Sequence, residues 1–346
     1  MNRRRTATLS LALVILGGLG SVASQELKIG IIDFYGLVQV TAGDARRALA
    51  FKEGDTITLA GDERPGVLAE SERRLSTLSG VARAHINLTC CESGRGIIYV
   101  GIEEKGRAAT HFHAAPTGSV RLAADVVQAG REFSEALKAA VLRGDAGEDD
   151  SEGHALFHDP ATRAIQERFI VYAARDLNAL RRVLRDSSNT EHRALAAQIL
   201  GYVGNKQKVV GDLVYGMRDS SEEVRNNAMR ALAVFAAPAA RATGVVLRVP
   251  FEPFIGLLNS PVWTDRNKAA LALMGLTERR NPRLLAKLRN KAIVPLVEMA
   301  RWKNEGHAMP ALKILGRIAG KSDDTTQTAW TRGEREAIIS AALKRH

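Results

Sequence analysis

Two pairs of histidines have the residue type and spacing of metal ligands. His111 and His113 are two residues apart, which places both side chains on one face of an extended chain, and His154 and His158 are four apart, as on one face of a helical turn. Imidazole groups with carboxylates nearby are ligands for first-row transition metals. Nothing in the sequence brings the two pairs together in space, so we interpret all four as polar loop residues and predict no metal and no other cofactor.

Familiar catalytic patterns are missing from the sequence. Gly316–Ser322 has the composition of a phosphate-binding loop, but its glycines are one residue too close together and it follows a predicted helix instead of a strand. We therefore assign Gly316 to helix packing and Gly320 to a helix C-cap. The sequence also has no Gly-x-Ser-x-Gly, no His-Glu-x-x-His and no spaced set of cysteines. These absences favour a binding protein, with a metal-binding enzyme built on helical repeats as an alternative.

The adjacent cysteines Cys90 and Cys91 lie in a predicted strand, where neighbouring side chains point to opposite faces. This geometry is unfavourable for a bridge between them. We expect Cys90 to be a small buried apolar residue and Cys91 an exposed thiol, so that the chain has no disulfide framework.

A four-residue phrase that occurs twice indicates how the second half of the chain is organised. Arg-Asp-Ser-Ser occurs at 185–188 and again at 218–221, an offset of 33 residues, and each copy separates two apolar-periodic segments. Further copies of the segment that follows begin at Arg266 and His307, and matched leucines in the four copies are 32, 41 and 42 residues apart. Such periods are typical of stacked helix pairs. We therefore predict an all-α helical-repeat solenoid over residues 161–346, with an insertion at Pro238–Pro253.

The second copy of this repeat is similar to a known family. Asp219–Arg225, followed by Ala228 and Leu232, resembles a HEAT or HEAT-like repeat. The resemblance covers about half of the chain and implies an array that binds proteins along a curved face. In such repeats the Asp and Arg are scaffold residues that cap and bridge neighbouring helices. The positions assigned to this role are Asp186, Arg193, Asp219 and Arg225.

Residues 25–104 have the pattern of a small α+β module. Leu27–Tyr35 is a predicted strand, Thr41 caps a first helix, a second helix follows Pro65, and a hairpin turns at Ser93–Gly96. The predicted order is β-α-α-β-β. The predicted fold class is therefore an α+β module followed by an all-α solenoid.

This module resembles the polypeptide-transport-associated (POTRA) domain. The resemblance is carried by five segments in the order of that family, namely Ile32–Leu37, Asp44–Leu49, Lys52–Asp55, Arg74–Val81 and Ile98–Glu104. It implies a location in the bacterial cell envelope and a module that binds other polypeptides by adding a strand to the edge of its sheet. The resemblance places this edge at Val81–Cys91. The partner-binding residues it suggests there are Arg83, His85, Asn87 and Thr89.

Residues 105–160 are predicted as a connector between the two parts. Val120–Leu142 has apolar residues along one helical face, and Asp145–Glu152 is an acidic, glycine-containing loop. Pro160 is expected to begin the first helix of the solenoid.

Residues 1–24 have the features of a signal peptide. Arg3–Arg5 is basic, Leu9–Leu19 is apolar, and Val22–Ser24 is a cleavage site of small residues. We therefore expect an exported, periplasmic protein. The segment is also long enough to span a membrane, so an uncleaved anchor in the inner membrane is the alternative.

The net charge of +11, three charges of which belong to the signal, suggests an anionic partner. Export argues against nucleic acid and leaves anionic membrane lipid, a cell-wall polymer or an acidic protein. Scattered Lys and Arg that solvate helix faces are the alternative explanation.

These features predict an exported, non-enzymatic scaffold or adaptor that binds envelope proteins or extended polypeptides by strand addition and by the solenoid face. The alternative is a membrane-anchored envelope component that resembles division proteins with a membrane helix before a POTRA domain.

Overall fold

A computed structural model of the chain describes residues 25–59, 64–107, 110–145, 147–150, 153–236 and 247–344. The predicted signal lies outside these residues, as do residues 238–246 of the predicted insertion. The described residues belong to two units. Of the described residues, the central unit contains those from Ala114 to Val249, and the split unit combines those from Gln25 to His113 with those from Pro250 onward.

The N-terminal part of the split unit is built on a four-stranded sheet with the strand order β2-β1-β4-β3. The pairs β1–β2 and β3–β4 are antiparallel, and β1 runs parallel to β4. The elements are β1 (Gln25–Tyr35), α1 (Ala42–Ala48), β2 (Thr56–Leu59), α2 (Gly66–Ser76), β3 (Val81–Glu92) and β4 (Arg95–Glu104).

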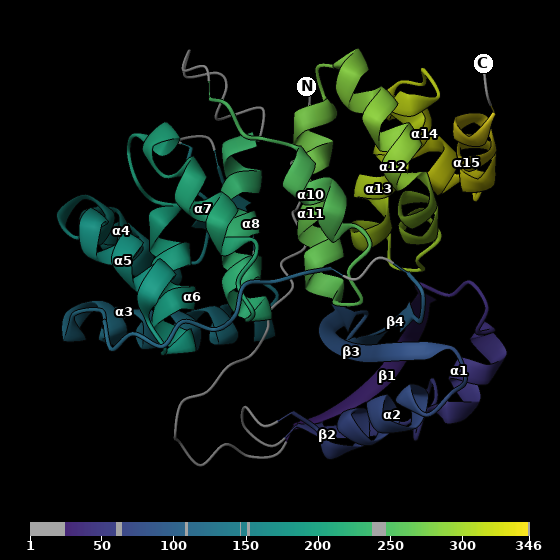
Figure 1. The fold of residues 1–346 in the computed structure, drawn as a ribbon, viewed down its shortest axis with the longest axis horizontal. Coiled ribbons are helices and arrows are strands. Elements are labelled where there is room, and N and C mark those ends of the chain that lie inside the picture. Colours follow the sequence, from purple (N-terminus) through teal and green to yellow (C-terminus); the bar gives the residue numbers. More distant parts are fainter. Residues whose placement is uncertain are drawn as a thin grey trace. The chain divides into compact units, whose positions relative to one another are not determined.

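The two faces of this sheet pack against different parts of the chain. Ile98 and Val100 of β4 point into a core with Leu68 and Leu75 of α2. Tyr99, between them in the strand, points the other way and packs against the C-terminal helices. Figure 1 shows α1 and α2 on one face of the sheet and the C-terminal helices on the other. The sheet is therefore covered on both faces.

The module contains a strand that the predicted β-α-α-β-β order lacks. Thr56–Leu59 forms β2, which pairs with the first residues of β1. We expected Thr56–Pro65 to be the entry to the second helix, with more Gly and Pro than is usual there. Its alternation of Thr with Ile and Leu is a period-two strand pattern too short to be decisive by itself. The observed order is β-α-β-α-β-β.

The C-terminal part of the split unit consists of helices. They are α10 (Glu252–Leu257), α11 (Trp263–Thr277), α12 (Pro282–Ala300), α13 (Glu305–Ile318), α14 (Asp323–Thr331) and α15 (Arg335–Leu343). α13 packs against both α11 and α12, as expected for helical repeats.

The central unit is mostly helical. Its elements are α3 (Ala124–Leu142), β5 (Glu148–Asp149), β6 (Leu156–Phe157), α4 (Pro160–Arg175), α5 (Leu177–Asp186), α6 (Thr190–Leu200), the 3-10 helix η1 (Lys206–Lys208), α7 (Val210–Gly216) and α8 (Glu222–Ala236). The pairs α5–α6 and α7–α8 are successive repeats, and α6 packs against α8. The mostly helical structure after an α+β start confirms the coarse fold class.

The two units do not follow the predicted boundaries. The predicted connector contributes α3, whose buried face includes Val126, Phe133 and Leu137, to the core of the central unit. The predicted solenoid 161–346 is divided at residues 249 and 250. The physical reason is that the helices after Pro250 bury large aromatic residues against the sheet instead of continuing only a repeat array.

The structure corrects the expectation for the cysteines. Cys90 and Cys91 are joined by a disulfide. The register of β3 against β4 shifts between Thr89 and Glu92. The strict alternation of side chains that argued against a bridge therefore does not hold at these two residues.

Among the described residues, none of the helices combines the length and apolar character needed to cross a membrane.

Candidate functional site

An aromatic cluster fixes the C-terminal helices on the sheet of the split unit. The ring of Tyr99 stacks on Trp263 and is tilted against Trp302, with centroids 4.9 Å away in both cases. The Tyr99 hydroxyl lies 2.7 Å from Nδ1 of His307, which begins the fourth copy of the repeat. These rings are buried, so the cluster is a packed junction.

Polar groups on the same sheet face are also used inside the split unit. The Tyr35 hydroxyl donates to the Pro261 carbonyl at 2.7 Å, and the Lys303 N–H donates to the Asp33 carboxylate at 2.9 Å. The Glu298 carboxylate accepts from the Gly36 N–H at 3.2 Å. These bonds fix the helices in one position on the sheet, because each has directional geometry.

Burial keeps Tyr99 and His307 of this junction neutral. It lowers the pKa of His307 to about 3, with Lys268 as a second cause. Burial also raises the pKa of Tyr99 well above its usual range, and the charge of Asp33 adds to this effect. A neutral imidazole accepts the hydrogen of a neutral phenol, so the pair is suited to structure and not to acid–base exchange with solvent.

Gly101→Ala tests how closely the helices approach the sheet. A Cβ at Gly101 would lie 1.9 Å from the Pro261 carbonyl oxygen and 2.6 Å from the Tyr35 ring. We expect this variant to lose about 2 kcal/mol of unfolding free energy through overpacking, measured by urea denaturation with tryptophan fluorescence. Gly66→Ala, whose Cβ would meet no atom within 4 Å, is the matched control. Equal stability of the two variants would contradict the close approach.

The predicted binding strand β3 is at an edge of the sheet, but half of its proposed contact residues are used internally. The side-chain oxygen of Asn87 accepts a hydrogen bond from the backbone N–H of Trp263 at 2.9 Å, and Thr89 is only 3% exposed. Arg83 is exposed and forms an ion pair with Glu103. His85 lies 3.3 Å from the carboxylate of Glu72. Of these four residues, Arg83 is exposed, His85 and Asn87 are half-buried, and Thr89 is buried.

An ion pair also occupies the outer edge of β3 at its centre. The Ile86 N–H donates to Glu72 at 2.6 Å, and the Ile86 carbonyl accepts from Arg64 at 2.8 Å. Arg64 and Glu72 are themselves an ion pair at 2.5 Å. The two side chains thus supply the hydrogen bonds that a neighbouring strand would supply, which protects the edge against pairing.

An ion pair bonds to the backbone of β1 in the same way, past the residues of β1 that pair with β2. The Ile32 N–H donates to Glu53 at 3.3 Å, and the Ile32 carbonyl accepts from Lys303 at 3.2 Å. Glu53 and Lys303 form an ion pair at 3.1 Å. Lys303 precedes α13, so this cap also connects the sheet to the C-terminal helices.

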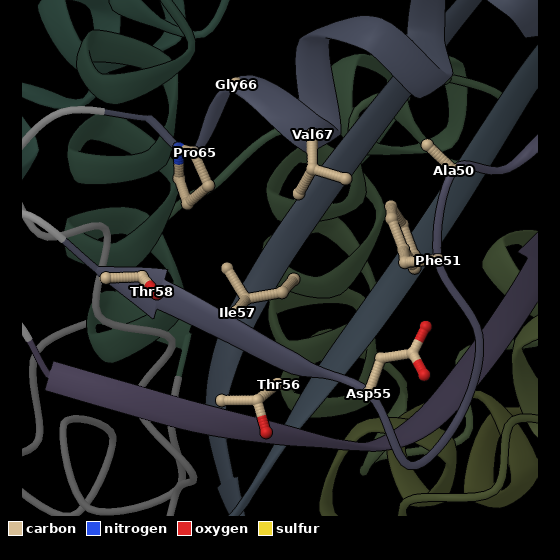
Figure 2. A pocket seen from close by; sticks show the side chains of 9 residues that line it. All are labelled: Ala50, Phe51, Asp55, Thr56, Ile57, Thr58, Pro65, Gly66 and Val67. Atoms are coloured by element: carbon tan, nitrogen blue, oxygen red, sulfur yellow. The ribbon is translucent and has the colours of Figure 1, made fainter.

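The opposite edge of the sheet has a cavity beside it. About 560 Å³ of space lies between β2 and the first turn of α2, lined by Ala50, Phe51, Asp55, Thr56, Ile57, Thr58, Pro65, Gly66 and Val67. Figure 2 shows Ile57 and Val67 pointing toward one another across this space, with Phe51 on one side of it. The pocket is open to one side, and its walls combine apolar side chains with the polar side chains of Asp55, Thr56 and Thr58. The volume is in the range of ordinary ligand sites.

The repeat residues of the central unit form a buried network. Arg193 donates to both oxygens of Asp219, at 2.8 Å and 3.0 Å, and both side chains are at most 3% exposed. Asp219 also accepts from the Ser221 N–H at 2.8 Å, just before α8. The pair therefore connects one repeat to the next and caps the following helix.

The structural period of the first two repeats is 32 residues, one fewer than the repeated phrase suggests. Arg193 donates to the Ser187 carbonyl and Arg225 to the Asp219 carbonyl, so Ser187 is the structural counterpart of Asp219. Arg266 donates to Ser260 in the same way. Asp186, which we assigned to the scaffold, is exposed at the end of α5 and lies outside this arrangement. The assignment of Asp186 is wrong because it was based on identical residues in the two Arg-Asp-Ser-Ser phrases, whereas the equivalent backbone positions are offset by one residue.

The histidine pairs are divided between the two units. His111 and His113 belong to the split unit, and His154 and His158 to the central unit. His154 stacks on Tyr202, and burial, followed by the charge of Lys206, lowers its pKa to about 4. Over the described part of the chain, no three His, Cys, Asp or Glu side chains are grouped as a metal site.

Sequence reasoning missed the aromatic junction and the cavity. A usable indication was the apolar run Gly96–Ile102, because a strand that is apolar at consecutive positions is buried on both faces. The positions of Trp263 and Trp302 just before predicted helices gave no indication of what they contact.

Comparisons with known proteins identify the repeats. A family model described as HEAT repeats matches residues 177–243, which confirms the repeat part of the sequence interpretation. No curated protein sequence matches the chain.

Solved structures that match part of the chain include three designed armadillo repeat proteins. The protein YIII(Dq)4CqI is 20% identical, with 56% of this chain and 97% of that chain covered and a TM-score of 0.35. A design for modular peptide recognition is 20% identical, with coverage of 63% and 98% and a TM-score of 0.37. The design YIII(Dq.V1)4CPAF in complex with the peptide (KR)4 is 18% identical, with coverage of 64% and 98% and a TM-score of 0.36. At these scores the similarities carry no argument about function.

Proposed function

We propose that this protein is a non-enzymatic scaffold that binds extended polypeptides, and that the site lies at β2 of the α+β module. The observation that carries the proposal is the open pocket of mixed polar and apolar lining between the edge strand β2 and helix α2. An edge strand offers backbone hydrogen bonds to an extended segment, and an adjacent pocket takes up one of its side chains. The occupant we propose is a polypeptide strand with one apolar side chain in the cavity.

The β2 edge is a better site than the β3 edge that the sequence suggested. At the centre of β3, a partner would have to displace the Arg64–Glu72 pair from the backbone of Ile86. It would also find Thr89 buried. At β2 an extended segment can pair with the backbone of the strand and place one side chain in the adjoining pocket, where part of the lining is apolar.

The HEAT repeats support a second contact surface for proteins, because stacked helix pairs offer an extended face. The resemblance of residues 27–104 to a POTRA domain supports polypeptide binding by the module and a place in the bacterial cell envelope. The signal-like residues 1–24 support export to the periplasm, with an inner-membrane anchor as the alternative.

Filling the cavity tests the proposal. A photoreactive residue at Thr58, which is exposed on β2, is expected to form polypeptide adducts in cells, identified by mass spectrometry. Val67→Trp should reduce their yield about tenfold or more, because the indole occupies the space of the incoming side chain.

The matched control is Val38→Trp, at an exposed position of the same module, which should leave the adducts unchanged. Thr58 adducts that persist in Val67→Trp, or polypeptide adducts that form only with probes in the helices, would refute a binding site at β2.

A further inference from the structure

Most of the net charge of the chain is concentrated in one segment of the split unit. Residues 279–321 contain eleven Lys and Arg and two Glu, a net charge of +9 out of the +11 of the whole chain. The segment runs from the end of α11 through α12 and α13 to the turn before α14. Four of these cations form ion pairs with acidic residues outside the segment, namely Lys287 with Glu252, Arg301 with Glu336, Lys303 with Glu53 and Arg317 with Asp323. The other seven Lys and Arg still leave the segment with an excess of positive charge.

Helix α12 presents part of this charge along a single face. The exposed Arg283 and Lys291 and the half-buried Lys287 recur every four residues and so lie along one side of the helix. Val294 lies in the same arc and is 54% exposed. The exposed arc contains no acidic side chain, and Lys287 is paired with Glu252 of the neighbouring helix.

The adjoining turns bring further cations to this surface. Arg280 donates to the Lys321 carbonyl, which joins the α11–α12 turn to the α13–α14 turn. Lys313 and Arg280 both lower the pKa of Asp323, whose main partner is Arg317. We call Arg279, Arg280, Arg283, Lys287, Lys291, Lys313 and Lys321 the cationic face.

Helix capping explains only part of this arrangement. Arg280, Arg289 and Arg317 donate to carbonyls at the ends of neighbouring helices, where cations are favourable. Arg279, Arg283 and Lys291 are exposed, and none of them is needed to cap a helix. Their accumulation is a feature that stability of the helices does not require.

We propose that the cationic face binds the anionic headgroups of a lipid bilayer. Lys and Arg close to an anionic bilayer each strengthen attachment, without any need for an enclosing pocket. The exposed Val294 among the cations favours a bilayer over an acidic polypeptide, because the interface takes up apolar side chains beneath the headgroups. This surface is distinct from the β2 cavity, so either proposal stands or fails without the other.

Vesicle binding tests the proposal with the full chain. Sedimentation with phosphatidylcholine vesicles containing about 30% phosphatidylglycerol, at ~0.1 M salt, should show binding that pure phosphatidylcholine vesicles lack. The triple variant Arg279→Gln, Arg283→Gln and Lys291→Gln should weaken this binding about 100-fold. A matched triple variant, Arg182→Gln, Lys208→Gln and Arg218→Gln, removes the same charge from the central unit and should have little effect.

Three outcomes would overturn the proposal. Equal losses in the two triple variants would show that net charge alone attracts the vesicles. Equal binding to both vesicle types would assign the attachment to apolar residues such as Leu9–Leu19. Tighter binding of soluble polyglutamate than of the anionic vesicles, lost in the first triple variant, would assign the cationic face to an acidic polypeptide.

Discussion

Replacing Asp219 with alanine is expected to destabilise the central unit by about 3–5 kcal/mol, since it leaves the guanidinium of Arg193 buried without its charge partner. The repeated phrase supplies an internal control. Asp186 has the same neighbours in sequence but is exposed, so Asp186→Ala is expected to change stability by less than about 0.5 kcal/mol.

Hydrogen exchange is the suitable measurement for this pair of variants. All three tryptophans of the chain, Trp263, Trp302 and Trp330, lie in the split unit, so fluorescence does not report on the central unit. Amide hydrogen exchange, measured by mass spectrometry on peptides from α6 and α8, reports on the stability of the central unit. Similar exchange in Asp219→Ala and Asp186→Ala would show that the Arg193–Asp219 pair does not hold the repeats together.

The stability of the split unit is expected to fall steeply as the pH drops below about 6.5. The folded state holds the pKa of His307 at about 3, against an ordinary value of 6.5, because the ring is buried. Below pH 6.5 the unfolded chain therefore binds a proton that the folded chain excludes, and stability decreases until the pH reaches the folded pKa. The expected loss from this residue between pH 7 and pH 4 is about 3 kcal/mol.

Tryptophan fluorescence in urea measures this loss directly, since Trp263 and Trp302 pack in the same cluster as His307. The control is His307→Gln, which keeps an acceptor for the Tyr99 hydroxyl and has no titratable ring. Subtracting the unfolding free energy of His307→Gln from that of the natural protein removes the contribution of the carboxylates, which titrate in the same range in both proteins. If the difference in unfolding free energy between the natural protein and His307→Gln were the same at pH 7 and pH 4, a buried, neutral His307 would be contradicted.

Much of the local structure could be predicted from the sequence because it depends on neighbours along the chain. Thr41 accepts from the Asp44 N–H as the capping pattern indicates, and Asp159 caps α4 just before Pro160. The apolar spacing of α3 identified the face that is buried, including Phe133. A helix period of 3.6 and a strand period of two are properties of the backbone itself, so they can be read without tertiary information.

The spacing of apolar residues was a more reliable guide to the repeats than the identity of the polar residues between them. The repeated Arg-Asp-Ser-Ser suggested that Asp186 and Asp219 are equivalent, whereas the arginine contacts pair Ser187 with Asp219. The matched leucines, at an offset of 32, had the correct spacing. Apolar positions are fixed by the packing of helix on helix, while polar residues in a turn can shift by one position without cost to the core.

The sequence by itself determined an α+β module followed by helical repeats, because periodic burial requires those elements. The tertiary structure alone decided which surfaces remain available. Thr58 and Thr89 are both β-branched residues on edge strands, yet Thr58 is exposed and Thr89 is 3% exposed. The difference arises because helices such as α11, whose Trp263 is 176 residues beyond Asn87 in the chain, pack on one face of the sheet near β3. No local pattern encodes a contact between segments so far apart, since burial depends on the packing of the whole unit.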